Sequence, residues 1–372
     1  MRCILVGVKT KNRSDKELKQ SLSELEGLVE ALNGVALGKI YQKRDIPDPA
    51  TFIGKGKAKQ LKEISEGVKA DTLIFDVELS PIQITNIEKI TDVQVIDRTD
   101  LILSIFSERA KTKQAKLQVE LATLQHQLPR VYGQKGKALS RIGGGMKTKG
   151  AGEKLGEIKA RRIKERISKI KKELEQIKKQ RKQQRKWRNK DQSVLKVALV
   201  GYTNAGKSSL LHRLTKRETF ISDQLFATLD TKTSYIMFPD VDKKVVITDT
   251  VGFVKDMPEE IMEAFMATLE EVEEADLILH VVDISDENWL EKLESVEKIL
   301  RKIKVEDKPS IVVLNKIDKI IPSADLIDHS QEGMMTGNKE SIIISTEKGW
   351  NVDKLMEKLK EFAVNLSPIG YN

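Results

Sequence analysis

The sequence predicts an α/β protein in three parts: a small parallel-sheet α/β subdomain at residues 1–106, an antiparallel helical hairpin of the coiled-coil type at 107–190, and a doubly wound α/β domain at 191–372. Three observations support this division. Strand-like and helix-like runs alternate near the N-terminus, the apolar spacing then changes to steps of three and four, and the alternation resumes near Ser193. A chain of 372 residues is long enough to bury more than one core.

The first part reads as a repeated strand–helix unit. Apolar runs at 3–8, 35–41, 72–77 and 93–97 are expected to be strands, and amphipathic runs at 17–32 and 57–68 to be helices. This alternation is typical of a small parallel sheet. The segment from Gly54 to Lys57 has glycines too close together for a standard phosphate-binding loop, so we interpret it as a helix N-terminal turn. A basic surface turn that contacts RNA is the alternative.

The hairpin is predicted from two narrow apolar seams with steps of three, four or seven residues, which is the spacing of a coiled coil. The seam positions are Ala110, Leu117, Leu121, Leu124 and Leu128 in the first helix and Ile163, Ile167, Ile170, Leu174 and Ile177 in the second. The segment between the two helices, residues 133–156, is then the tip loop of the hairpin.

The tip and its stalk are strongly basic. Residues 133–156 hold eight Gly, six Lys or Arg and a single acid, Glu153, and residues 159–190 hold 16 Lys or Arg against 3 acids, a net charge of +13. Such clustering is repulsive in isolation and favours contact with the phosphates of RNA. The few aromatics, Tyr132 and Trp187, favour phosphate and shape recognition over base stacking. A solvated linker beside a solvated helix face is the alternative.

A phosphate-binding loop is predicted where the third part begins. The strand-like run VALV leads into G-x-x-x-x-G-K-S and then into a helix, the setting that this motif requires. Lys207 would reach the β and γ phosphates, and Ser208 would bind Mg²⁺. Asn204 also raises the hypothesis of a bound K⁺, with hydrogen bonding within the loop as the alternative. The predicted nucleotide-binding residues are Gly201, Tyr202, Thr203, Asn204, Ala205, Gly206, Lys207, Ser208 and Ser209.

A second motif, D-x-x-G, follows the strand-like run VVIT. Asp249 at the strand end fits a carboxylate that helps to hold Mg²⁺, and Gly252 would let its N–H approach the γ phosphate because no Cβ intervenes. Between the two motifs, Thr228 is the best candidate for a switch threonine that binds Mg²⁺, with Thr231 and Thr233 as rivals. Lys207, Thr228 and Gly252 are therefore the predicted catalytic residues.

Base recognition is predicted at Asn315, Lys316 and Asp318, after the strand-like run IVVL. A carboxylate at 318 can accept two hydrogen bonds from guanine, which adenine cannot offer, so the expected nucleotide is GTP or GDP with Mg²⁺. Ser345 and Thr346 lie where a further loop would orient the base. Residue 253 is Phe, where many GTPases place a glutamine that orients the attacking water, so we expect slow intrinsic turnover. The third part is thus predicted to be a P-loop GTPase domain.

Composition limits the alternatives. The single cysteine, Cys3, excludes an internal disulfide and a multi-cysteine metal site, and its apolar surroundings predict a buried, inert thiol. No apolar run is long enough to span a membrane, and the N-terminal run is too short for a secretory signal. We expect a cytoplasmic protein that is a monomer and has no DNA partner.

A resemblance to the HflX family of translational GTPases covers nearly the whole chain. It is carried by GYTNAGKSSL, DQLFATLD and DTVGFV, and in the N-terminal half by ATFIGKGKAKQL and DRTDLILSIFSERAKTKQAKLQVELATLQHQLPR. The resemblance implies a GTPase that binds the large (50S) ribosomal subunit and its rRNA and, in bacteria, helps to split or rescue stalled ribosomes. The tip departs from the family pattern R-G-P-G-E-T-Q-L-E, because it reads KTKGAGEKLGE, which retains Gly152 and Glu153 but lacks the Pro, Thr and Gln.

Two other functions stay open at this point. One is a GTP-dependent regulatory switch whose coiled coil binds a protein partner. The other is an ATP-driven RNA remodeller that works through the N-terminal part, although the chain has only one match to the phosphate-loop motif.

Overall fold

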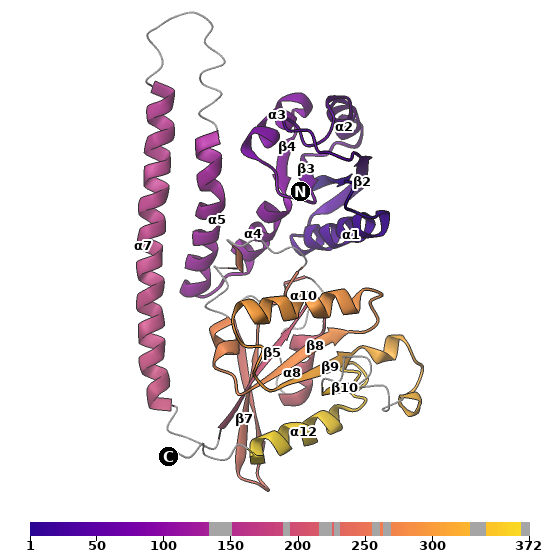
Figure 1. The fold of residues 1–372 in the computed structure, drawn as a ribbon, viewed down its shortest axis with the longest axis vertical. Coiled ribbons are helices and arrows are strands. Elements are labelled where there is room, and N and C mark those ends of the chain that lie inside the picture. Colours follow the sequence, from indigo (N-terminus) through magenta and orange to yellow (C-terminus); the bar gives the residue numbers. More distant parts are fainter. Residues whose placement is uncertain are drawn as a thin grey trace, which may run out of the picture. The chain divides into compact units, whose positions relative to one another are not determined.

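The computed structural model describes residues 1–133, 151–188, 194–215, 225–226, 231–254, 261–262, 269–327 and 340–365. These residues form two compact units, built mainly from Met1–Gln176 and from Ile177–Met257 with Phe265–Asn372. The first unit therefore combines the N-terminal sheet with most of the hairpin. Figure 1 shows the elements of both units.

The first unit contains a four-stranded parallel sheet with the strand order β2-β1-β3-β4. Its strands and helices are β1 (Arg2–Lys9), α1 (Asp15–Ala31), β2 (Val35–Lys43), α2 (Lys55–Val68), β3 (Thr72–Phe75), α3 (Pro81–Thr91), β4 (Gln94–Asp97) and α4 (Arg98–Arg109). All four predicted strands are confirmed. Gly54 is the N-cap of α2, which confirms the interpretation of the basic glycine segment as a helix start.

Helix α3 is an element that the apolar pattern did not predict. It is only weakly amphipathic, but its start carries two local signals. Pro81 stands at the first helical position, and the Ser80 side chain accepts a hydrogen bond from Gln83 N while the Gln83 side chain accepts one from Ser80 N. This capping box was the available sequence signal.

The hairpin consists of α5 (Lys113–Gly133) and α7 (Ala151–Arg188), which lie side by side in Figure 1. Arg166 forms a bidentate ion pair with Glu120, and Lys113 lies 3.9 Å from Glu173. The partners are seven residues apart on both helices and run in opposite directions, so the helices are antiparallel with coiled-coil spacing. Every predicted seam residue is buried or half-buried, but Ala110 caps the end of α4 and lies outside α5, so its assignment to the first hairpin helix was wrong.

The predicted tip loop is too long at its C-terminal end. Helix α7 begins at Ala151, so residues 151–156 are helical although they include Gly152 and Gly156. Ala, Glu, Lys and Leu in this stretch are strong helix formers and offset the two glycines, each of which costs about 1 kcal/mol in a helix. Residues 134–150 of the predicted loop lie outside the described residues.

The second unit contains a six-stranded sheet with the order β10-β9-β8-β5-β7-β6. Its elements are β5 (Val194–Gly201), α8 (Lys207–Thr215), β6 (Lys232–Phe238), β7 (Lys243–Asp249), β8 (Leu277–Asp283), α10 (Trp289–Lys302), β9 (Ser310–Asn315), two 3₁₀ turns (Ile317–Lys319 and Ala324–Leu326), β10 (Ser341–Ile343) and α12 (Val352–Asn365). The doubly wound prediction is confirmed, and β6 is an additional antiparallel edge strand.

The strand order of this sheet determines where a ligand would bind. The chain moves from β5 to β7 on one side and to β8 on the other, so β5 marks the point at which the winding direction reverses. Ligands of doubly wound sheets bind at the carboxyl ends of the strands next to this point. The loops after β5, β7 and β9 carry the three predicted nucleotide motifs, and all three leave the same edge of the sheet.

Two composition-based expectations can be compared with the structure. Cys3 is fully buried in β1, and burial raises the pKa of its thiol to about 11, which keeps it protonated and unreactive at neutral pH. Across the ranges that the structure describes, no helix combines the length and the apolar character needed to cross a bilayer.

Candidate functional site: a phosphate loop and a base loop at one sheet edge

The predicted phosphate-binding loop connects β5 to α8, and its glycines are required by close contacts. Gly201 has φ +153°, and a Cβ there would lie 2.2 Å from the Val281 carbonyl oxygen of the neighbouring strand. Gly206 has φ +98°, and a Cβ there would lie 2.3 Å from Asn315 Nδ2. Only glycine fits both positions without a shift of the backbone. The loop therefore packs against β8 and against the predicted base loop.

Lys207 lies inside the loop and is buried. Its ammonium donates to the carbonyl oxygens of Gly201 and Tyr202, at 3.0 and 2.9 Å. Burial lowers the pKa of Lys207 to about 8, and the attraction of Asp249 opposes this shift. A phosphate in the loop would raise the pKa of Lys207 again, because it supplies the counter-charge that the carbonyl dipoles replace only in part.

Ser208 and Asp249 lie together, as the magnesium prediction requires. Ser208 Oγ donates to Asp249 Oδ2 at 2.6 Å, and the Asp249 side chain is fully buried at the end of β7. A hydroxyl and a carboxylate are hard oxygen ligands of the type that Mg²⁺ prefers. The residues present therefore fit a magnesium ion. Ser209 follows on the first turn of α8 and is half-buried.

The D-x-x-G segment lies directly against the phosphate loop. Phe253 N donates to the Gly201 carbonyl at 3.1 Å, and the Phe253 carbonyl accepts from Thr203 N at 2.7 Å. A Cβ on Gly252 would come within 2.8 Å of Thr203 and within 3.0 Å of Lys207 Nζ. Gly252 is thus packed closely against Thr203 and Lys207, where a side chain would not fit.

The predicted base loop is joined to the phosphate loop by hydrogen bonds. Asn315 Nδ2 donates to the Ala205 carbonyl at 2.9 Å. Lys316 adopts φ +67°, and its ammonium donates to the Asn204 carbonyl at 2.7 Å and lies 2.8 Å from Asp283 Oδ2. Asp283 ends β8 and was not predicted to be part of the site. Its signal in the sequence was a polar residue at the end of an apolar strand, the same signal that identified Asp249.

The remaining predicted residues complete the base loop. Ser345 Oγ donates to Asp318 Oδ1 at 2.5 Å and accepts from Lys348 N at 2.9 Å. Thr346 donates to Asn315 Oδ1 from its backbone N, at 3.0 Å, and from its hydroxyl, at 2.8 Å. The Thr346 hydroxyl therefore adds a hydrogen bond that an alanine at this position could not make. The loop after β10 holds both Asn315 and Asp318 in place.

The three candidate switch threonines have different outcomes. Thr228, the predicted ligand, lies outside the described residues. Thr233 lies within β6, and its hydroxyl lies 3.2 Å from that of Thr248 on the paired strand β7. This contact ties Thr233 to the sheet. Thr231 immediately precedes the strand and is half-buried.

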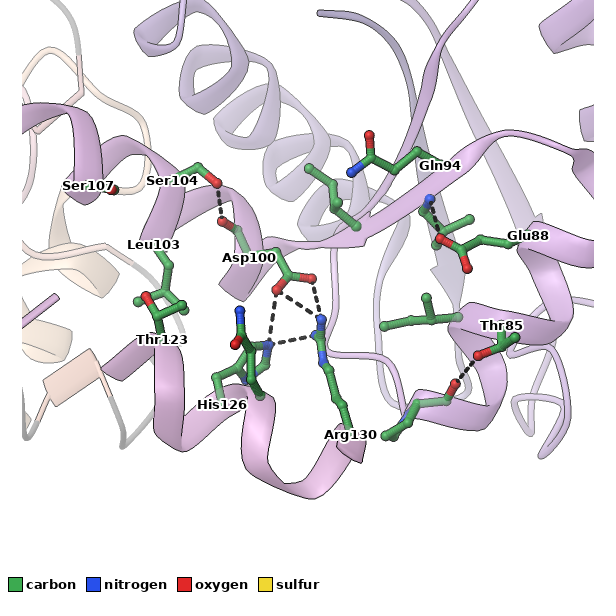
Figure 2. Close-up of a pocket in the computed structure, with 15 residues that line it drawn as sticks. Thr85, Glu88, Gln94, Asp100, Leu103, Ser104, Ser107, Thr123, His126 and Arg130 are labelled. Atoms are coloured by element: carbon green, nitrogen blue, oxygen red, sulfur yellow. Dashed lines mark hydrogen bonds and ion pairs between the residues drawn. The ribbon is translucent and has the colours of Figure 1, made fainter. Parts of the chain in front are cut away.

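A second cluster of charged residues, which the sequence analysis did not single out, lies in the first unit. Arg130 donates to Asp97 at 2.8 Å and to both oxygens of Asp100 at 2.9 and 2.8 Å. His126 Nε2 lies 3.4 Å from Asp100 and 3.7 Å from Asp97. Figure 2 shows His126, Arg130 and Asp100 pointing toward one another at the wall of a pocket of about 520 Å³. The sequence signal for this cluster was spacing: the two acids are three residues apart and the two bases are four residues apart, as on one face of a helix.

This cluster is balanced in charge without a metal ion. Asp97, Asp100 and His126 offer ligand atoms within 4.8 Å of one another, but the guanidinium of Arg130 already lies between the two carboxylates. Burial disfavours a charged imidazole, yet hydrogen bonds to Asp100 and Asp97 outweigh it and raise the pKa of His126 to about 9. With the imidazole and the guanidinium both charged, the two bases balance the carboxylates of Asp97 and Asp100. The cluster joins α5 to the start of α4 and is best explained as a structural contact.

Three family profiles match the chain in succession. They are described as GTP-binding GTPase N-terminal, matching residues 19–107, GTP-binding GTPase Middle Region, matching 109–188, and 50S ribosome-binding GTPase, matching 196–316. Among solved structures, a GTP-binding protein from the hyperthermophilic archaeon Sulfolobus solfataricus in complex with GDP is 28% identical with a TM-score of 0.53. That similarity covers 99% of this chain and 100% of the archaeal chain.

Curated relatives give the same result. GTPase HflX of Alkalihalophilus pseudofirmus is 43% identical over 286 residues, which cover 77% of this chain and 67% of the relative. GTPase HflX of Escherichia coli K12 is 40% identical over 272 residues, which cover 73% and 63%. The alignments thus span about two thirds of the length of these relatives. The chain therefore belongs to the HflX family and is a P-loop GTPase.

Proposed function

We propose that this GTPase binds the large (50S) ribosomal subunit through its basic hairpin and acts in the splitting, rescue or quality control of ribosomes. The observation that carries the proposal is the exposed basic surface of α7. In the part of α7 that belongs to the first unit, the exposed cations include Lys159, Arg161, Arg162, Lys169, Lys171 and Lys172. They lie off the apolar seam, so an anionic partner can reach them while the hairpin stays packed. The profile for 50S ribosome-binding GTPases supports the choice of partner.

The hairpin is suited to RNA by both shape and charge. A long antiparallel pair of helices can present a Gly- and Lys-rich tip to an irregular surface at a distance from the rest of the protein. Its cations would bind rRNA phosphates and report shape rather than base sequence. A cytoplasmic location, a monomeric state and the absence of a DNA partner also remain part of this proposal.

The nucleotide site would work through the residues that the sheet edge brings together. Lys207 would exchange its two carbonyl partners for phosphate oxygens, and Gly252 would admit the γ phosphate because it has no side chain. Asp318, held by Ser345, would read guanine. Ser208, Asp249 and the switch residue Thr228 would hold Mg²⁺, which supplies charge compensation at the phosphates when bound. The result is a GTP-dependent switch.

Turnover by the isolated protein is expected to be slow. Phe253 is buried against the phosphate loop, and its ring cannot donate or accept the hydrogen bond that orients water. The ribosome would then accelerate hydrolysis by ordering the switch segments. Asn204 supports a further hypothesis of a bound K⁺, because it is exposed and its amide makes no hydrogen bond to the part of the chain that the structure describes. Replacing K⁺ by Na⁺ in the turnover assay tests this.

The test is GTP turnover with and without purified 50S subunits. We expect strong stimulation, its loss in Lys207→Ala, and a weaker effect after deletion of residues 143–156. Lys→Gln substitutions at Lys169, Lys171 and Lys172 should reduce 50S binding and its salt dependence. The matched control carries Lys→Gln at the exposed lysines Lys298, Lys302 and Lys304 of the second unit, with the same charge change and no expected effect.

The outcome distinguishes RNA from a protein partner. Binding that weakens steeply with rising salt supports contact with rRNA phosphates, whereas stimulation absent at both low and moderate salt would contradict the proposal. In that event, the regulatory switch that binds a protein through its coiled coil becomes the better explanation. Nucleotide turnover that survives Lys207→Ala would instead indicate a second site.

A further inference from the structure

The side chain of Thr203, in the phosphate loop, carries a hydroxyl group that has no hydrogen-bond partner among the described residues. The residue is 7% exposed, and its hydroxyl oxygen is inaccessible to solvent and makes no hydrogen bond among the described residues. Burial of an unpaired hydroxyl destabilises a protein, and such atoms are uncommon in native structures. Thr250, in the D-x-x-G motif, provides a contrast, because its buried hydroxyl donates to the Leu199 carbonyl at 2.7 Å.

The position of Thr203 relates its hydroxyl to the γ phosphate. A Cβ on Gly252 would lie 2.8 Å from both Thr203 Cα and Cγ2 and 3.0 Å from Lys207 Nζ. Thr203 is therefore packed against the two groups expected to meet the γ phosphate. The Thr203 hydroxyl and the Cγ2 methyl group are bonded to the same Cβ atom. The hydroxyl therefore lies within about one side-chain length of the space beside Gly252 and Lys207 Nζ.

The backbone around Thr203 is fixed, which leaves only the side chain to adjust. Thr203 N donates to the Phe253 carbonyl at 2.7 Å, and Phe253 N donates back to the Gly201 carbonyl at 3.1 Å. This double hydrogen bond sets the direction of the Cα–Cβ bond. The stiff, β-branched side chain then has few rotamers available, so a rotation about χ1, and not a loop movement, would bring its hydroxyl to a bound phosphate.

We propose that the Thr203 hydroxyl donates a hydrogen bond to a γ-phosphoryl oxygen during hydrolysis and supplies transition-state stabilisation that Phe253 cannot. Water oxygen bonds to the γ phosphorus while the bond from phosphorus to the β–γ bridging oxygen breaks, and GDP leaves with that electron pair. The proton of the water passes to the inorganic phosphate, and Thr203 keeps its own proton. A prearranged donor at a site of developing charge acts mainly on the transition state.

Thr203→Val tests the proposal, since it removes the hydroxyl and keeps the branched shape. We expect kcat at saturating GTP to fall about 10- to 100-fold, with the Kd for a fluorescent GDP analogue changed less than about twofold. The affinity for GDP with aluminium fluoride, which imitates the transferring phosphoryl group, should fall in parallel with kcat. Thr203→Ser should restore turnover to within about threefold, because it retains the donor.

Thermal unfolding of the nucleotide-free protein provides a readout independent of catalysis. Thr203→Val should have an unchanged or higher Tm, because it removes an unpaired buried hydroxyl, whereas Thr250→Val should have a lower Tm, because it leaves the Leu199 carbonyl without its donor. Turnover of Thr203→Val equal to that of the unmodified protein would overturn the proposal. So would a lower Tm, since it would show that the hydroxyl already has a partner in the protein.

Discussion

Asn315 Nδ2 donates to the Ala205 carbonyl at 2.9 Å and so connects the base loop to the phosphate loop. Its other amide atom, Oδ1, accepts from both the N–H and the hydroxyl of Thr346. One buried side chain thus joins the loops after β5, β9 and β10. Asn315, the first residue of the base loop, therefore holds the three loops together, and this role is separate from base recognition.

Asn315→Ala should weaken nucleotide binding, because the hydrogen bonds that connect the three loops are lost. The change leaves the Ala205 carbonyl and the Thr346 donors without their partner in a buried setting, a loss of about 1–3 kcal/mol for each unpaired group. We expect the Kd for GDP to rise at least about tenfold, together with a lower Tm without nucleotide. Titration calorimetry and thermal unfolding measure the two effects. An unchanged Tm would show that the loops keep their positions without Asn315.

Asp318→Asn should change base specificity and leave the phosphate loop intact. The carboxylate can accept from both guanine N1–H and the 2-amino group, whereas an amide presents one donor and one acceptor. We expect GDP affinity to fall about 100-fold or more, and xanthosine diphosphate to bind better than GDP. Competition between the two nucleotides measures this directly. Equal loss of affinity for both would mean that Asp318 acts only through its hydrogen bond with Ser345.

Much of this site was predictable because its elements are local in sequence. The phosphate loop, Asp249 and the base loop each follow an apolar strand, and parallel strands deliver their carboxyl ends to one sheet edge. Contacts between distant segments were not predictable. Asp283 reaches Lys316 only because β8 pairs with β9, and the contact of Phe253 with Gly201 depends on the conformation of the segment after β7. No periodic pattern encodes such contacts.

The same distinction holds for the fold. Strong apolar periodicity predicted β1, β3, β8 and the seam of the hairpin. Helix α3 was missed because tertiary packing and a capping box, rather than amphipathicity, determine it. The start of α7 was placed too late because the glycines suggested a loop that local helix propensity overrides.

The lowered pKa of Lys207 predicts proton uptake on nucleotide binding. Burial places the pKa near 8 in the nucleotide-free protein, and diphosphate charge should raise it toward or above the usual value for lysine. At pH 8, GDP binding should therefore take up on the order of half a proton. At pH 6.5, where Lys207 is already charged, this uptake should be absent. Calorimetry in buffers with different ionisation enthalpies measures it, and equal proton uptake at both pH values would contradict the assignment.

Arg130→Gln should destabilise the first unit more than a comparable change on the hairpin surface. Arg130 neutralises Asp97, whose side chain is fully buried, and Asp100, so its removal leaves buried negative charge unpaired. We expect a loss of about 3 kcal/mol in the free energy of unfolding. The matched control is Arg166→Gln, which removes a bidentate pair whose side chains are 38% and 40% exposed and should destabilise the protein far less, because solvent screens that pair.

The pH dependence of the Arg130→Gln defect tests its electrostatic origin. Burial raises the pKa of Asp100, but hydrogen bonds and attraction from His126 and Arg130 outweigh it and hold the pKa below the ordinary value of 3.8. A carboxyl group of this kind stabilises the fold above its unfolded-state pKa and loses that contribution as pH falls. The difference between Arg130→Gln and the unmodified protein should therefore be largest near neutral pH and should shrink as Asp100 becomes protonated. Urea unfolding near pH 7.5 and near pH 3, below the ordinary pKa of an aspartate, measures the change. A defect of constant size would instead indicate lost packing of the arginine side chain.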